Sequence, residues 1–162
     1  MRIAIMSDSH DNIWKLETAM PHFEGADAII HCGDLIAPFM IIRLIKGAGG
    51  IPVHIVWGNN DGDKRLLTEV AASAENIHLH GDFAEIELDG LKMAVNHYPK
   101  IARALAESGR YDLVCYGHDH TAHEELIGDT LLLNPGEVMG LNSRSTIALY
   151  NTQTRQVAFV EL

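Results

Sequence analysis

RIAIMSDSH, residues 2–10, sets the pattern of this chain: a short apolar run ends abruptly in a polar segment that carries Asp8 and His10. Such a run is typical of a buried strand, and the polar segment is typical of the loop that follows it. Residues 12–22 place apolar side chains three and four positions apart, which predicts a helix with one apolar stripe. A strand followed by such a helix is the start of a βαβ pattern.

The same pattern occurs twice more. ADAIIHCGD (26–34) and PVHIVWGNND (52–61) are predicted strands with polar ends. Each precedes a predicted helix, over residues 37–47 and 63–73 respectively. These repeats predict a sheet of parallel strands with helices packed on it.

The second half of the chain changes character. Short strands predominate there, with one helix predicted over residues 100–109 and a two-residue hairpin turn at Asp89-Gly90. Strand and helix repeats followed by strand-rich sequence predict an α/β fold. We expect a layered αββα sandwich, in which two mixed sheets pack face to face with helices on the outside.

Composition excludes several classes of protein. A chain of 162 residues that is 47% hydrophobic predicts a single domain over residues 1–162. No apolar run reaches the roughly 18 residues of a membrane span, and the first residues become polar too soon for a signal peptide, so we expect a cytoplasmic protein without a membrane partner. Cys32 and Cys115 lie in apolar stretches, which predicts reduced, buried thiols. The formal net charge of −10 argues against general nucleic-acid binding, which needs Lys and Arg to neutralise phosphates.

Five predicted strands end in side chains that can bind metal ions. In open α/β sheets ligands bind beyond the carboxyl ends of the strands, so residues distant in sequence can converge there. Each motif alone is as common in ordinary turns as in sites, but their combination at successive strand ends favours a site. The candidate ligands are Asp8, His10, Asp34, Asn59, His97, His118 and His120.

The donor set indicates which ions would bind. It offers oxygen and imidazole nitrogen but no thiolate, which suits Mn²⁺, Fe²⁺, Ni²⁺ or Zn²⁺ better than a structural zinc site built on cysteine. Seven ligands are too many for one ion that keeps an open position. They suit two divalent ions that share a carboxylate, roughly 3.5 to 4 Å apart.

The ordered series of motifs resembles the calcineurin-like metallophosphoesterases, specifically their small, single-domain YfcE type. The resemblance runs from residue 2 to about residue 140 and includes LNPGE, residues 133–137. It implies two metal ions, Mn²⁺ first, with Ni²⁺, Fe²⁺ or Zn²⁺ as alternatives. It also implies the following ligands: Asp8, His10 and His120 for one ion, Asn59, His97 and His118 for the other, and Asp34 as the bridge.

The activity that the resemblance implies is phosphodiester hydrolysis by in-line attack of a metal-bridging hydroxide, with Asp34, Asn59 and His97 as the catalytic residues. A small phosphoester substrate and a homodimer or homotetramer are implied as well. One alternative is a phosphomonoesterase of the same fold. The other is a protein-binding scaffold similar to the retromer subunit of this fold, but that scaffold has lost ligand residues, whereas this chain retains all seven.

The sequence departs from the family pattern at two positions. Many relatives carry histidine after the Gly-Asn asparagine, as a candidate acid for the leaving group, whereas this chain has Asn60. We therefore expect good leaving groups to be favoured. Tyr98 stands where glycine is common, and its ring could narrow the pocket or stack on a base.

Other polar residues near the motifs have less direct expectations. His31 is expected to pack beneath the site, and Asp61 either orients a ligating histidine or caps the helix at residue 63. The segment that holds His118 and His120 is expected to be extended, with Asp119 pointing elsewhere. The remaining histidines are interpreted as surface or packed residues: His22, His54, His78, His80 and His123.

Overall fold

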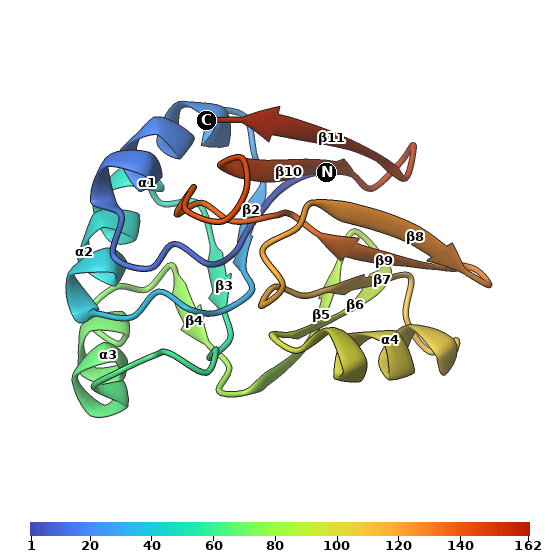
Figure 1. Ribbon diagram of the computed structural model, residues 1–162, viewed down its shortest axis with the longest axis horizontal. Coiled ribbons are helices and arrows are strands. Elements are labelled where there is room, and N and C mark those ends of the chain that lie inside the picture. Colours follow the sequence, from blue (N-terminus) through green and yellow to red (C-terminus); the bar gives the residue numbers. More distant parts are fainter.

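Two β-sheets pack face to face in the computed structural model, which describes residues 1–162, and helices cover their outer faces (Figure 1). This arrangement confirms the predicted αββα sandwich. Sheet A has the strand order β11-β10-β1-β2-β3-β4. Its strands are β1 (Arg2–Met6), β2 (Ala28–His31), β3 (Val53–Ile55), β4 (Ile77–Leu79), β10 (Thr146–Asn151) and β11 (Gln156–Glu161).

Sheet B has the strand order β5-β6-β7-β9-β8. Strands β6, β7 and β9 run parallel, and the edge strands β5 and β8 are antiparallel to their neighbours. Asp89 and Gly90 both have positive φ and join β5 to β6, which confirms the predicted hairpin turn. The strands are β5 (Phe83–Leu88), β6 (Leu91–Asn96), β7 (Leu113–Cys115), β8 (His123–Ile127) and β9 (Thr130–Asn134).

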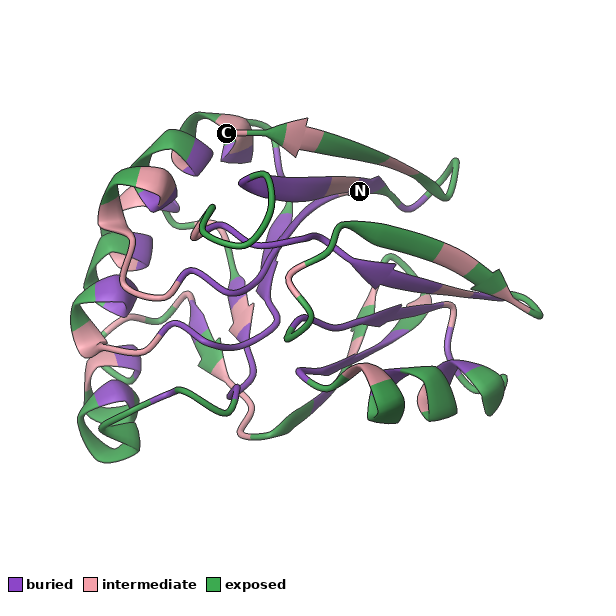
Figure 2. Ribbon diagram, viewed as in Figure 1, coloured by how far each residue is buried: buried purple, intermediate pink, exposed green.

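Four α-helices complete the outer layers. Helices α1, α2 and α3 follow β1, β2 and β3 and cover sheet A, whereas α4 packs on β6, β7 and β9 of sheet B. Each helix buries the side that faces its sheet (Figure 2). The helices are α1 (Ile13–Ala19), α2 (Pro38–Gly47), α3 (Lys64–Ala71) and α4 (Pro99–Glu107).

The helix predictions were correct in place and slightly long. The expected helix over residues 12–22 ends at Ala19 and continues as a 3₁₀ helix, η1 (Met20–Phe23), which holds Pro21 in its first turn. Helix α3 begins after Asp63, whose side chain accepts a hydrogen bond from the Leu66 N–H at 3.0 Å.

The core consists of three apolar layers. Side chains alternate along the strands, so Ile3 and Ile5 of β1 point toward sheet B, whereas Ala4 and Met6 point toward the helices of sheet A. The layer between the sheets includes both cysteines, which are buried free thiols, as predicted. The packing of the two sheets brings their strand ends to one side of the molecule.

None of the helices combines the length and the apolar character of a membrane-spanning segment.

Candidate metal centre

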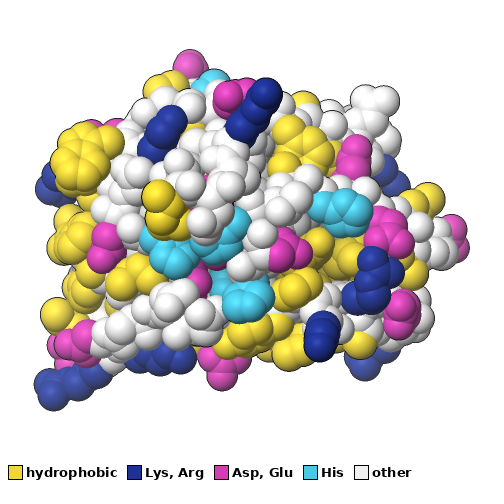
Figure 3. Space-filling view, viewed as in Figure 1, with side chains coloured by type: hydrophobic (Ala, Val, Ile, Leu, Met, Phe, Trp, Pro, Cys, Tyr) yellow, Lys and Arg dark blue, Asp and Glu magenta, His cyan; other side chains and the backbone are white.

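The strand ends that carry the predicted ligands converge where the two sheets meet. The loops after β1, β2 and β3 come from sheet A, and those after β6 and β7 come from sheet B. Hydrogen bonds join the two groups directly; for example, the His118 N–H donates to Asp8 Oδ2 at 3.0 Å. Histidine side chains gather near the middle of this face, with acidic side chains beside them (Figure 3). The site therefore spans the seam between the sheets.

One half of the site is built around His97, which is fully buried. Its Nδ1 lies 2.8 Å from the carbonyl oxygen of Cys32 and must donate a proton to it, because a carbonyl can only accept. In the neutral ring, Nε2 therefore carries a lone pair. That lone pair faces Asn59 Oδ1 at 3.1 Å and Asp34 Oδ2 at 3.4 Å. His118 Nδ1 lies 2.8 Å from the same Asn59 oxygen.

The other half is built around Asp8, whose side chain is also fully buried. Its Oδ1 atom lies 3.3 Å from His120 Nε2 and 3.7 Å from His10 Nε2. Neither Asp8 Oδ1 nor His10 Nε2 has a hydrogen-bond partner. Because buried polar atoms are rarely left without partners, this pair indicates a missing positive charge between them.

Asp34 lies between the two halves. Its Oδ2 atom is 3.4 Å from His10 Nε2 and 3.4 Å from His97 Nε2. Asn60 donates to both carboxylate oxygens, from its backbone N–H at 2.8 Å and from its side-chain amide at 2.7 Å. Burial alone would raise the pKa of Asp34, but the contact with the His97 imidazole and the two hydrogen bonds from Asn60 outweigh it and lower that pKa well below its ordinary value. Asp34 is therefore a carboxylate at neutral pH.

Contacts of 2.8 to 3.7 Å thus link all seven predicted ligands into one cluster. Two sets offer three ligand atoms within 4.8 Å of one another: Asp8, His10 and His120, and Asp8, Asp34 and His97. Lone pairs and carboxylate oxygens face one another across these sets, which is unfavourable without a cation. The donor set and its unpaired atoms fit divalent metal ions.

Glu137 belongs to the site but was missed by the sequence analysis. It is fully buried, and its Oε2 lies 2.6 Å from His120 Nδ1. Its Oε1 accepts the backbone N–H groups of Asn142 and Ser143. The carboxylate therefore holds the proton of His120 on Nδ1, which leaves Nε2 free toward Asp8. Glu137 directly follows the turn sequence Asn-Pro-Gly, where an acidic residue is ordinary, so nothing in the local sequence indicated its burial.

The backbone around the site is strained. Seven of the nine non-glycine residues with positive φ lie in its loops: Asp8, His10, Asp11, Asp34, Ile36, His118 and His120. The expectation of an extended segment at His118 and His120 was therefore wrong, since both residues are left-handed. Such conformations persist only where surrounding contacts hold them, and they are concentrated at functional sites.

Close packing makes one glycine necessary. A Cβ on Gly58 would overlap the carboxylate of Asp34. The predicted orientation of Asp119 is confirmed, because its carboxylate turns aside to accept a hydrogen bond from Asn134 at 2.5 Å. Tyr98 packs its ring against His97 and His118, with centroids 5.4 and 5.3 Å apart, so it forms one wall of the site.

Asp61 does neither of the two things expected of it. Its oxygens accept four backbone N–H groups at 2.6 to 3.1 Å, from Asp34, Leu35, Ile36 and Gly58. It orients no histidine, and the helix cap is Asp63 instead. Asp61 therefore ties the loop after β2 to the loop after β3.

His31 lies beneath the site, as predicted. Its Nδ1 accepts the Gly33 N–H at 3.2 Å, so its Nε2 carries the proton and lies 3.1 Å from Ser9 Oγ. Burial lowers the pKa of His31 to about 4, so the ring is neutral at pH 7. Both nitrogens have partners within the protein, and neither is free to bind a metal.

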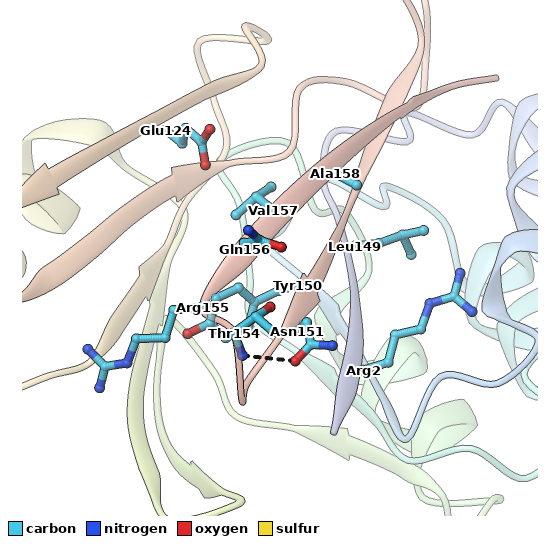
Figure 4. A pocket seen from close by; sticks show the side chains of 10 residues that line it. All are labelled: Arg2, Glu124, Leu149, Tyr150, Asn151, Thr154, Arg155, Gln156, Val157 and Ala158. Carbon is cyan, nitrogen blue, oxygen red and sulfur yellow. Dashed lines mark hydrogen bonds between the residues drawn. The ribbon is translucent and has the colours of Figure 1, made fainter.

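The largest hollow lies elsewhere. A cavity of about 670 Å³ opens beside β10 and β11 and is lined by Arg2, Tyr150 and Arg155 among others (Figure 4). Arg2 donates to the Glu24 carbonyl, and Arg155 pairs with Asp112. Because both of its arginines are engaged elsewhere, this cavity offers no free cation to an anionic ligand.

The chain is similar to known proteins in both sequence and fold. Residues 1–155 match the family model of the calcineurin-like phosphoesterase superfamily domain. A phosphodiesterase of Methanocaldococcus jannaschii is 34% identical over an alignment of 163 positions, which covers 96% of each chain. The solved structure of an archaeal phosphodiesterase superposes with a TM-score of 0.93 at 32% identity and covers all of both chains.

A more distant structure shares the fold alone. Yfce, a phosphoesterase from E. coli, superposes with a TM-score of 0.69 at 16% identity, covering 99% of each chain. The family match over most of the chain and the 34% identical relative establish membership beyond the fold. This chain therefore belongs to the calcineurin-like phosphoesterase superfamily.

Proposed function

We propose that this protein, as one domain over residues 1–162, hydrolyses small phosphodiesters with the aid of two divalent metal ions. One observation carries the proposal: the lone pair on His97 Nε2, fixed by the Cys32 carbonyl, faces Asn59 Oδ1 and Asp34 Oδ2 at 3.1 and 3.4 Å. Three acceptors directed at one another within a buried site call for a positive charge between them, which a bound metal ion would supply.

The two halves of the cluster support a separate ligand set for each ion. Asp8, His10 and His120 would hold one ion, and Asn59, His97 and His118 would hold the other. Asp34 would bridge them, since its Oδ2 is equidistant from the His10 and His97 nitrogens. The mixed oxygen and imidazole donors suit Mn²⁺, Ni²⁺, Fe²⁺ or Zn²⁺, and the family resemblance puts Mn²⁺ first.

When bound, two such metal ions would supply a hydroxide nucleophile at neutral pH for in-line attack and would neutralise charge on the phosphate oxygens. Asp8 and Asp34 together contribute two negative charges, fewer than the four positive charges of two divalent ions. The centre therefore attracts an anionic ester despite the net charge of −10. Asn60 holds both oxygens of Asp34 and so keeps the bridging carboxylate in place.

Two side chains support a diester with a good leaving group as the substrate. The amide of Asn60 cannot protonate a departing alkoxide and is already bonded to Asp34. Tyr98, 36% exposed, presents its ring at the edge of the site, where it can contact the second ester group of a diester. A monoester lacks that group.

The test is an activity assay after metal removal. Protein treated with chelator should be inactive on an aryl phosphodiester, and Mn²⁺ or Ni²⁺ should restore more activity than Mg²⁺. His97→Ala should abolish hydrolysis, whereas the matched variant His123→Ala, at an exposed position on β8, should not.

The result can contradict the proposal in two ways. Faster hydrolysis of the matching monoester would indicate a phosphomonoesterase of the same fold. Metal-loaded protein that hydrolyses neither ester would indicate a scaffold without catalytic activity.

A further inference from the structure

Three histidines outside the metal centre gather at the edge of sheet A. His54 lies on β3, His78 lies on β4 as its direct partner in the strand register, and His80 follows the end of β4. The neighbouring residues Val53, Ile55 and Ile77 pack toward the helices, so the three imidazoles share the opposite face. Elsewhere on that face, sheet A carries apolar residues such as Ile30 and Val56.

The rings are in direct contact. His54 Nδ1 and His80 Nε2 lie 3.0 Å apart and share one proton in a hydrogen bond, which a bound ion would replace. The ring centroids of His54 and His78 are separated by 5.0 Å, and those of His54 and His80 by 5.2 Å. His78 is exposed and lines an open depression of about 500 Å³ together with Glu75 and Asn76. An ion in solvent can therefore reach the cluster.

From this arrangement we propose that His54, His78 and His80 form a further metal site, which binds a single Zn²⁺, Ni²⁺ or Cu²⁺ ion. Two nitrogens bound to one ion at about 2.0 to 2.1 Å lie roughly 2.9 to 3.4 Å apart. The 3.0 Å between His54 and His80 already falls in that range. The three rings do not present three nitrogens within 4.8 Å of one another, so the exposed side chain of His78 would turn to supply the third nitrogen.

The chemistry of the cluster selects the ion. All three donors are imidazoles, which suit Zn²⁺, Ni²⁺ and Cu²⁺, whereas Mg²⁺ and Mn²⁺ prefer oxygen ligands. Burial lowers the pKa of His54 to about 4 and also lowers the pKa of His80. Both rings are therefore neutral near pH 7, as metal ligands must be. The ion would tie the edge strand β4 to β3, whose carboxyl end leads to Asn59.

The experiment counts bound ions in full-length, untagged protein. Wild-type protein and His78→Gln are stripped with chelator, equilibrated with Zn²⁺ or Ni²⁺, separated from free metal and analysed for metal content. We expect His78→Gln to bind one ion fewer per chain than wild type. His123→Gln, which removes another exposed histidine, should bind the same number as wild type.

Two further readouts separate this site from the metal centre. His78→Gln should keep full Mn²⁺-dependent phosphoesterase activity. Its affinity for the Zn²⁺ or Ni²⁺ ion at the histidine cluster should fall roughly tenfold or more. At a hundredfold excess of Zn²⁺ over Kd, Tm should rise by roughly 5 to 10 °C more in wild type than in His78→Gln. The proposal would be overturned if wild type and His78→Gln bound the same number of ions per chain. It would also be overturned if His123→Gln lost as many ions as His78→Gln.

Discussion

Replacement of Glu137 by glutamine tests the reasoning about His120 most directly. The carboxylate accepts three hydrogen bonds: from His120 Nδ1 at 2.6 Å, from the Asn142 N–H at 2.7 Å and from the Ser143 N–H. Glutamine has nearly the same shape but only one accepting oxygen. Its NH₂ group must therefore face either His120 or the two backbone donors.

The magnitude follows from the bonds that are lost. A hydrogen bond to a charged group contributes about 1.5 to 3 kcal/mol, and a buried donor left unpaired costs a similar amount. We expect the free energy of unfolding of metal-free protein to fall by about 2 kcal/mol, which lowers Tm by roughly 4 to 8 °C. Because the ring of His120 is no longer held, Mn²⁺ affinity should fall roughly 10- to 100-fold.

Two measurements check these values, urea unfolding without metal and Mn²⁺ titration of activity. Glu124→Gln, the same change at an exposed position on β8, should alter neither. If Glu137→Gln lowers stability but leaves Mn²⁺ affinity within twofold of wild type, then Glu137 supports the loop alone. That result would refute its role in positioning His120.

Three further predictions concern the residues around the centre. His31 takes up a proton near pH 6.5 when unfolded but only near pH 4 when folded, so the unfolded state binds more protons between these values. This residue alone should therefore lower the free energy of unfolding by about 2 kcal/mol from pH 7.5 to pH 5. Urea unfolding in chelator should show a smaller fall in His31→Asn. Gly58→Ala should displace Asp34 and reduce metal content, whereas a normal metal content would contradict the steric reasoning. Asn60→His removes the amide bond to Asp34 but should raise the rate on esters with poor leaving groups, relative to the rate on esters with good ones, by up to roughly 100-fold; an unchanged ratio would argue against a proton donor there.

Sequence patterns predicted the layers of the fold and the grouping of the seven candidate ligands. They succeeded because strand ends are visible as sharp changes from apolar to polar residues, as at Met6 and Ser7. The contact of Glu137 with His120 was not predictable in this way, because it depends on the path of the loop from 138 to 145. Local spacing also suggested a helix cap or a histidine partner for Asp61. Its oxygens instead accept backbone N–H groups of a loop that lies about 26 residues earlier in the sequence, such as that of Leu35.

The position of the centre on the seam between the sheets has a mechanical consequence. Its donors belong to both sheets, which otherwise contact each other mainly through apolar side chains. Bound ions would therefore cross-link the two sheets at one end of the sandwich. Withdrawal of the ions should loosen that end first, while the opposite end stays closed by its packing. Amide hydrogen exchange would then quicken beside Asp8 and Gly117 and remain slow at the far ends of β1 and β6.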